Sequence, residues 1–336
     1  MIAGIVACHA EPDGAGTGDD DDGTGDGNPT TAPPIELGDR CADPGPDAPV
    51  VPRIEPTAST FEGFDVETYL PDGLRGVVFY FYGGDTVVEW NGYEQTAFAN
   101  QMYDAGVGFV VTDRTVPGNG AQWDDHTLPI DANDDLARLE RLRQHLIDTT
   151  PLEADTPIVS AGFSDGAAFS VFFATVMQQR GWPITVLLVH NSGAGGTDLP
   201  DVPIWTTAAA HDEGGTRAGA EQIADEQRKR GFDATFTLVE ERTLTPDVFL
   251  RNPEWDDEKT AEVWADIVGL GLIDDSGARL PSDAELEPAL SAYGKNSTFR
   301  GSAIVESRIR VAWATHRYSA LYTADECAFA LDALGL

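Results

Sequence analysis

Strand-like and helix-like segments alternate along this chain from Gly76 to Glu240, and this alternation restricts its possible folds more than any other feature. Unbroken apolar runs such as Gly76–Tyr82 (GVVFYFY) are typical of strands that are buried on both faces of a sheet. Segments with leucines at helical spacing, such as Asp131–Asp148, separate these runs. Repeated strand–helix units form mostly parallel sheets with helices on both faces, so we predict an α/β fold.

Apolar runs, helical periodicity and turn residues define the individual elements. The predicted strands are Phe61–Tyr69, Gly76–Tyr82, Val107–Thr112, Ile158–Ala161, Thr185–His190, Pro203–Ala209 and Ala234–Glu240. The predicted helices are Tyr93–Asp104, Asp131–Asp148, Ala167–Gln179, Ala218–Arg230, Thr260–Leu270 and Ala324–Leu334. From about 243 to 302 the alternation gives way to loop and helix, which predicts a helical insertion in the domain.

Residues 162–166 read Gly-Phe-Ser-Asp-Gly, a G-x-S-x-G motif between a predicted strand and a predicted helix. Glycine on either side of the motif allows a tight turn that exposes the hydroxyl of Ser164. The N-terminus of the following helix favours negative charge that develops beside the serine. We therefore predict that Ser164 is a nucleophile, with a simple glycine-rich turn as the alternative.

A serine nucleophile needs a base that is held in place by an acid. In the α/β-hydrolases, which this serine motif resembles, the base comes last along the chain, and His316 follows every candidate acid and precedes the final predicted helix. Asp212, at the end of a predicted strand and 48 residues after Ser164, is the preferred acid. Asp198, which follows the preceding strand, is the alternative.

Backbone amides must also stabilise the oxyanion of the reaction intermediate. The amide of Asp165, directly after the serine, is one predicted donor. The resemblance to the α/β-hydrolases implies the second donor, the amide of Gly84, in the loop that follows the first central strand. We expect the neighbouring side chains of Tyr82 and Phe163 to contact the substrate.

The serine motif, the Ser–Asp–His order and the double glycine after a central strand together resemble the α/β-hydrolases. The resemblance covers about 60–243 and 304–336, and it implies a serine hydrolase of carboxylic esters that needs no metal and no organic cofactor. A weaker likeness to polyhydroxybutyrate depolymerases, feruloyl esterases and dienelactone hydrolases rests on Trp123, on Asp134 and Asp135, and on the serine-to-acid spacing. The alternatives are a serine peptidase and an inactive surface-binding lipoprotein on a hydrolase fold.

The predicted insertion carries several large apolar side chains, including Trp255 and Trp264. A soluble surface would not normally expose such residues together. Because the insertion leaves the sheet at the end where the serine is expected, we predict that these tryptophans form a lid or a wall of the acyl pocket. An appendage that packs on a distant face is the alternative.

The N-terminal region 1–57 has the composition of a disordered acidic spacer rich in Gly, Asp and Pro, and 58–336 forms the predicted hydrolase domain. Ile5-Val6-Ala7-Cys8 resembles a bacterial lipobox within a truncated signal, which predicts export and lipidation of Cys8. Of the three cysteines, Cys41 and Cys327 either form a disulfide in an oxidising compartment or remain thiols.

Acidic residues outnumber basic ones by 57 to 21, which gives a formal net charge of -36. Such a surface repels nucleic acids and anionic lipids, so the expected partner is a small or polymeric ester, and membrane contact is expected only through a lipid anchor. The acidity is typical of salt-adapted proteins, although an acidic bias of the source genome is equally consistent with it. No cysteine belongs to a CxxC pair, so we do not expect a zinc site.

Overall fold

The computed structural model describes residue 41 and residues 55–83, 93–116, 122–193, 198–212, 216–250, 255–296 and 302–336. Of the predicted spacer 1–57, Cys41 and residues 55–57 are among them, whereas Cys8 and the lipobox lie outside the described residues. Within the described ranges, no helix is long and apolar enough to cross a membrane.

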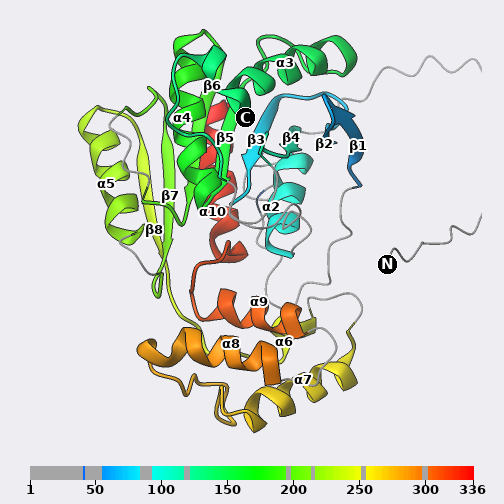
Figure 1. Ribbon diagram of the computed structural model, residues 1–336, viewed down its shortest axis with the longest axis vertical. Helices are drawn as coiled ribbons and strands as arrows, with labels where there is room; N and C mark the ends of the chain where they lie inside the picture. Colours follow the sequence, from blue (N-terminus) through cyan, green and yellow to red (C-terminus); the bar gives the residue numbers. More distant parts are fainter. Residues whose placement is uncertain are drawn as a thin grey trace, which may run out of the picture. The chain divides into compact units, whose positions relative to one another are not determined.

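One eight-stranded sheet forms the centre of the described chain, with the strand order β1-β2-β4-β3-β5-β6-β7-β8 (Figure 1). The strands are β1 (Thr57–Phe61), β2 (Phe64–Tyr69), β3 (Gly76–Phe81), β4 (Val107–Thr112), β5 (Ile158–Phe163), β6 (Ile184–His190), β7 (Ile204–Ala209) and β8 (Ala234–Val239). β2 pairs antiparallel with β1 and β4, and all other pairs are parallel. The predicted mostly parallel sheet is confirmed. Every residue of β3, β4, β5 and β7 is buried, so these strands form the interior part of the sheet.

The predicted strand Phe61–Tyr69 is wrong in one respect, because it is divided between two strands. Glu62 and Gly63 form a two-residue turn between β1 and β2, with φ of 52° and 87°. Positive φ at both positions matches the right-handed twist of an antiparallel hairpin. The apolar pattern alone did not reveal this turn, because glutamate rarely adopts positive φ.

Five helices cover the sheet and follow the predicted positions closely. They are α2 (Tyr93–Asp104), α3 (Asp134–Thr149), α4 (Asp165–Gln179), α5 (Thr216–Lys229) and α10 (Thr323–Leu334), and the short 3-10 turns are η2 (Ile130–Ala132), η3 (Asp283–Glu285) and η4 (Ala320–Tyr322). α3 begins later than predicted because η2 precedes it and Asn133 caps it, with the Asn133 side chain accepting the N–H of Leu136.

Neighbouring residues of β7 show how the two faces of the sheet are covered. The ring of Trp205 packs 5.4 Å from that of Phe329 in α10, whereas the hydroxyl of the next residue, Thr206, donates to the carbonyl of Ala220 in α5. Since successive side chains of a strand point to opposite faces, α10 and α5 lie on opposite faces. The strand register extends this pattern, so that α3, α4 and α5 share one face and α2 and α10 the other.

The insertion folds as a group of helices that lie together after β8 (Figure 1). They are α6 (Asp247–Leu250), α7 (Asp257–Gly269), α8 (Leu286–Asn296) and α9 (Ser302–Ala312). Their apolar side chains form a second core, made of Leu244, Phe249, Val263, Ile267, Leu272, Ile273, Leu286, Leu290, Tyr293, Val305, Ile309, Ala312 and Trp313. α9 ends four residues before His316, so the insertion returns to the domain next to the predicted base.

Cys41 and Cys327 form a disulfide, which settles the question that the sequence left open. Their Cα atoms lie 5.6 Å apart although 286 residues separate them. Both residues are buried, and Cys327 belongs to α10. The bond therefore attaches the segment before β1 to the last helix of the domain.

Candidate active site

Ser164 occupies the turn between β5 and α4, with φ of 56° and ψ of -120°. Few residues other than glycine adopt such a backbone conformation, and holding one costs about 1–3 kcal/mol. The surrounding contacts maintain it, because the Ser164 amide donates to the His190 carbonyl at 2.9 Å. The serine side chain is therefore presented at the carboxyl end of the central strand.

The two glycines of the motif are required by close backbone approach. A Cβ on Gly162 would overlap the carbonyl of Gly166, and a Cβ on Gly166 would overlap the carbonyl of Phe81 in β3. A Cβ on Gly83, in the loop after β3, would lie 2.7 Å from the Cβ of Ser164. β3, β5 and α4 thus meet at distances that only glycine permits.

Gly166→Ala is therefore expected to lower the free energy of unfolding by more than about 2 kcal/mol, since the neighbouring backbone of β3 cannot move aside. Chemical denaturation measures the difference. Gly269→Ala is the matched control, because a Cβ at the end of α7 meets open space, so alanine there should leave the free energy of unfolding unchanged or raise it by up to about 1 kcal/mol. Equal stability of the two variants would contradict the close approach.

His316 lies in the loop between α9 and α10, and its imidazole bridges the serine and an aspartate. Nε2 lies 2.7 Å from the hydroxyl of Ser164, and Nδ1 lies 2.8 and 3.0 Å from the carboxylate oxygens of Asp212. The side chain of Asp212 is 4% exposed, whereas that of His316 is 38% exposed. The chain of hydrogen bonds thus runs from a buried carboxylate to a histidine and a serine that face solvent.

Asp198, the alternative acid, lies elsewhere. Its backbone carbonyl accepts a hydrogen bond from the hydroxyl of Thr175 at 3.0 Å. Thr175 follows Ser164 by eleven residues along α4, a rise of about 16 Å at 1.5 Å per residue. Asp212, not Asp198, is the carboxylate beside His316.

Backbone contacts hold the loop that carries His316. The amide of His211 donates to the carbonyl of Ala314 at 2.9 Å, which joins the strand end that bears Asp212 to this loop. The side-chain amide of Asn191 donates to the carbonyl of Arg317, also at 2.9 Å. Sequence reasoning missed Asn191, although an asparagine directly after a strand is a signal: it tolerates the positive φ of 49° found here.

A buried polar network lies beneath the serine turn and connects it to α10. Nε2 of His190 lies 2.9 Å from Oε1 of Glu326, and both side chains are fully buried. The hydroxyl of Tyr318 donates to the other oxygen of Glu326 at 3.3 Å, and burial raises the pKa of Tyr318 well above its ordinary value. Because the His190 carbonyl holds the Ser164 amide, this network supports the backbone of the turn.

Of the two predicted oxyanion donors, Asp165 lies within the described residues. The amide of Asp165 is at the first position of α4, where helix amides have no partner within the helix. The Asp165 carboxylate accepts the N–H of Trp123 at 3.0 Å, and burial raises its pKa although Trp123 and Arg114 oppose the shift. Gly84 lies outside the described residues, so its role stays a prediction.

The two side chains expected to contact substrate have different surroundings. The ring of Phe163 lies 5.1 Å from that of His316, beside the nucleophile. Tyr82 is buried, and its hydroxyl donates to Asp113 at 2.6 Å. Burial, followed by this hydrogen bond to a carboxylate, raises the pKa of Tyr82. The Tyr82 side chain therefore has a structural partner, and its contact with a substrate stays a prediction.

Trp255 and Trp264 both pack against the core of the insertion. The ring of Trp255 lies 6.5 Å from that of Phe249, and Trp264 lines a cavity whose other lining residues also belong to the insertion. A segment of about 60 residues must bury its own apolar surface to fold, which gives these rings a structural role. Their predicted contact with an acyl chain stays a prediction.

An ionic network at the base of the insertion lies next to the acid. Glu241 accepts hydrogen bonds from Arg279, which belongs to the insertion, and from His211, the neighbour of Asp212. Arg279 also pairs with Asp283. Burial favours the neutral form of Glu241, but the hydrogen bonds from Arg279 and His211 outweigh it and lower its pKa.

Glu241→Gln is expected to reduce the free energy of unfolding at pH 7 by about 1–2 kcal/mol. A carboxyl whose pKa is lowered on folding stabilises the protein above its unfolded pKa, and this contribution disappears as the pH falls through the folded pKa. The deficit of the variant should therefore shrink below about pH 4.5. Denaturant unfolding across pH measures it, with the exposed neighbour Glu240→Gln as the control; an equal deficit in both variants would contradict the network.

Among the residues that the structure describes, no group of three or more His, Cys, Asp or Glu side chains is arranged to hold a metal ion.

Three features of the site together are diagnostic of one fold: a serine on a strained strand-to-helix turn, an acid after a later parallel strand, and a histidine last along the chain. They stand on a mostly parallel sheet with helices on both faces. This is the α/β-hydrolase fold.

No protein-family model matches this chain, and no curated protein matches it significantly. Solved structures similar to it include an esterase of Pyrobaculum calidifontis, with 16% identity, a TM-score of 0.40, and 70% of this chain and 89% of that chain covered. The Bacillus cereus carboxylesterase has 11% identity and a TM-score of 0.41 over 53% of this chain and 85% of its own. An arylesterase has 12% identity and a TM-score of 0.41 over 60% and 79%.

Proposed function

We propose that this protein is a serine hydrolase that cleaves carboxylic esters through an acyl-enzyme intermediate. The observation that carries the proposal is the hydrogen-bonded series from Asp212 through His316 to Ser164. Each of its three residues has the chemistry its place requires: a carboxylate that orients an imidazole, and an imidazole within reach of the hydroxyl proton.

In the proposed reaction, the oxygen of Ser164 attacks the ester carbonyl while Nε2 of His316 takes its proton. Asp212 accepts the Nδ1–H of the same ring, which selects the tautomer with a free Nε2 and stabilises the imidazolium. The amides of Asp165 and Gly84 donate to the oxyanion of the tetrahedral intermediate. The intermediate collapses when His316 returns the proton to the leaving alcohol, and the acyl group stays on the serine.

Deacylation repeats these roles with water as the nucleophile. His316 takes a proton from water, the hydroxide oxygen attacks the acyl carbonyl, and the proton passes back to Ser164 as the carboxylic acid leaves. The partly exposed imidazole gives water access to the acyl-enzyme. Neither half of this cycle requires an oxidant, a reductant or an organic cofactor.

The decisive experiment uses the purified full chain with a fluorophosphonate probe and a pair of substrates. We expect the probe to label the peptide that contains Ser164, and p-nitrophenyl butyrate to be hydrolysed much faster than the corresponding p-nitroanilide. Preference for the anilide would favour a peptidase. Absence of both labelling and hydrolysis in folded protein would overturn the proposal and favour an inactive binding protein.

We also propose that the protein is exported and held at the cell envelope through lipidated Cys8. The disulfide between Cys41 and Cys327 supports this, because such bonds persist in oxidising compartments. When the protein is expressed with a bacterial lipoprotein signal sequence, it should fractionate with membranes, and Cys8→Ser should release it. Recovery of the wild-type protein in the cytoplasm would contradict the proposal.

A further inference from the structure

A buried carboxylate that the proposed reaction does not use lies on α10, the last helix of the chain. Glu326 is in the first turn of this helix, which packs on β6 (Figure 1). Its side chain is fully buried, and glutamate is almost never fully buried unless other polar groups hold it. The groups that hold Glu326 therefore indicate its role.

Glu326 contacts one residue from each of two chain segments. Oε1 lies 2.9 Å from Nε2 of His190, and Oε2 accepts a hydrogen bond from the hydroxyl of Tyr318 at 3.3 Å. The rings of His190 and Tyr318 also pack edge to face, with their centroids 4.8 Å apart. All three side chains are buried, which strengthens polar contacts among them. The carboxylate thus fixes the two rings relative to each other.

His190 connects this cluster to the nucleophile. It is the last residue of β6, and its carbonyl accepts the amide of Ser164 at 2.9 Å. On the other side of the ring, Nδ1 lies 3.4 Å from the hydroxyl of Thr207 in β7. The ring therefore has a partner at each nitrogen. A shift of this ring would move the carbonyl that holds the strained backbone of Ser164.

Tyr318 connects the same cluster to the base. It follows His316 by two residues, in the loop between α9 and α10. Its ring lies 6.4 Å from that of Phe98 in α2 and 6.1 Å from that of Tyr322. Aromatic contacts tolerate small displacements, whereas a hydrogen bond to a carboxylate is directional. Glu326 therefore helps to set the position of the loop that carries His316.

We propose that Glu326 is a positioning residue that aligns the nucleophile with the base. Through His190 it sets the turn that carries Ser164. Through Tyr318 it sets the loop that carries His316, whose Nε2 lies 2.7 Å from the serine hydroxyl. A displacement of about 1 Å between reacting groups costs up to about a hundredfold in rate, so this buried carboxylate contributes to catalysis without touching substrate. The role presupposes the ester hydrolysis proposed above.

Kinetics of Glu326→Gln with p-nitrophenyl butyrate test the proposal. The amide keeps the size of the side chain but replaces one acceptor oxygen by a donor, so one of the two contacts is lost. We expect kcat to fall about 10- to 100-fold while KM stays within about threefold, because both half-reactions use the misaligned pair. Tyr318→Phe removes one hydroxyl and keeps the ring, and it should lower kcat about 3- to 10-fold.

Reaction with the fluorophosphonate probe separates positioning from stability. A folded but misaligned enzyme should be labelled completely, at a rate reduced by the same factor as kcat/KM, whereas partial unfolding would lower the labelled fraction instead. Asp325→Asn is the matched control, because it removes the exposed carboxylate of the preceding residue and should keep kcat within about twofold. Leu331→Val, on the buried face of the same helix, should lower stability to urea and keep the labelling rate.

The outcomes separate this role from the proposed function. Unchanged kcat and labelling rate in Glu326→Gln, beside an active wild-type protein, would overturn the positioning role and leave ester hydrolysis standing. If that variant does not fold, unchanged kcat in Tyr318→Phe would overturn the role in the same way. An equal loss in Leu331→Val would show that lost stability is the cause and would also overturn it. A wild-type protein that neither hydrolyses the ester nor reacts with the probe would overturn the proposed function, and the positioning role with it.

Discussion

Replacement of Ser164 by alanine is expected to lower kcat for p-nitrophenyl butyrate by about 10⁵- to 10⁶-fold, the range typical of a lost serine nucleophile. The reason is chemical: without the hydroxyl, no acyl-enzyme forms, and the imidazole of His316 has no proton to take from its 2.7 Å partner. The variant should fold normally, because glycine-like strain at this turn is held by the surrounding backbone.

Asp212→Asn extends the same prediction, with an expected loss of about 10⁴-fold in kcat. An amide at this position can donate to Nδ1, which stabilises the wrong tautomer of His316 and leaves the imidazolium without its carboxylate. Asp198→Asn is the matched control and should keep kcat within about twofold, because Asp198 lies near Thr175, far along α4.

Steady-state kinetics with the purified variants measure these effects, and circular dichroism checks that they fold. Ser164→Ala combined with Asp212→Asn should be no slower than Ser164→Ala alone, because groups that act as a unit are not additive. Ser59→Ala in β1 is a serine control that should keep full activity. Full activity of Ser164→Ala, or a larger loss in Asp198→Asn than in Asp212→Asn, would show that the proposed series is not the catalytic one.

Removal of the disulfide is expected to cause the largest loss of stability. Replacing both Cys41 and Cys327 by alanine should lower the free energy of unfolding by about 4–5 kcal/mol. The bond closes a loop of 286 residues, and long loops lose the most conformational entropy in the unfolded state when they are closed. Urea unfolding of the wild-type and double-variant proteins gives the difference.

A reductant distinguishes the stability that the disulfide bond contributes from the stability that packing of the two side chains contributes. Dithiothreitol should destabilise the wild-type protein by nearly the same amount and should have no effect on the double variant. Cys8→Ser is the matched control, since it removes the cysteine that does not pair with the other two. Hydrolysis under native conditions should persist in the double variant, because neither cysteine contacts the series from Asp212 to Ser164. A loss below about 1 kcal/mol would indicate that the bond contributes little.

The sequence by itself determined the central sheet and the position of the serine. Runs such as Gly76–Tyr82 are so uniformly apolar that only burial on both faces accommodates them, and such runs predicted the central strands of the sheet. The G-x-S-x-G motif is equally local. Its glycines are needed for contacts within the turn and with the adjacent strand, so the short segment itself indicated the strained geometry at Ser164.

Only the tertiary structure decided which distant groups meet. Asp198 and Asp212 both follow predicted strands, and nothing local separates them, because their distances from His316 depend on the order of strands in the sheet. The pairing of Cys41 with Cys327 has the same origin. Side-chain contacts across 100 or more residues depend on packing, which no periodic pattern encodes.

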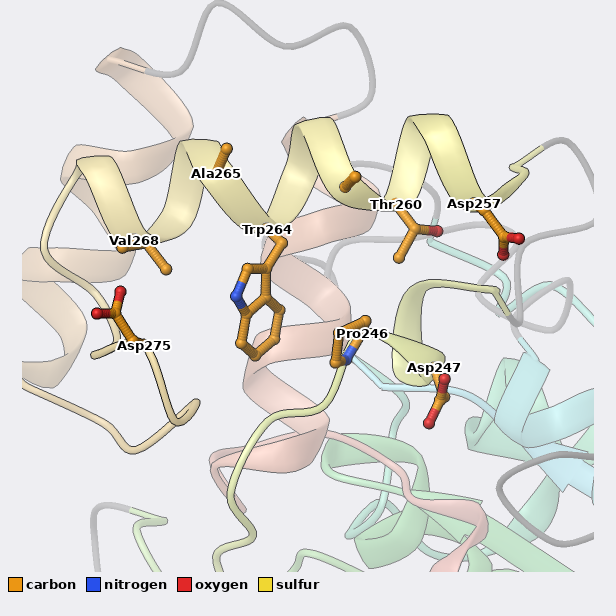
Figure 2. Close-up of a pocket in the computed structure, with 9 residues that line it drawn as sticks. Pro246, Asp247, Asp257, Thr260, Trp264, Ala265, Val268 and Asp275 are labelled. Atoms are coloured by element: carbon orange, nitrogen blue, oxygen red, sulfur yellow. The ribbon is translucent and has the colours of Figure 1, made fainter.

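In the insertion, too, the sequence determined one property and the tertiary structure decided another. Its apolar residues were visible in the sequence, and their number required burial, but the sequence did not say what would bury them. In the folded chain Trp264 packs on the insertion's own core and lines a cavity together with Thr260 (Figure 2). Composition required that most of these side chains be buried at least in part, and the packing of α6 against α7 decided where, because a cavity exists only between elements that have already met.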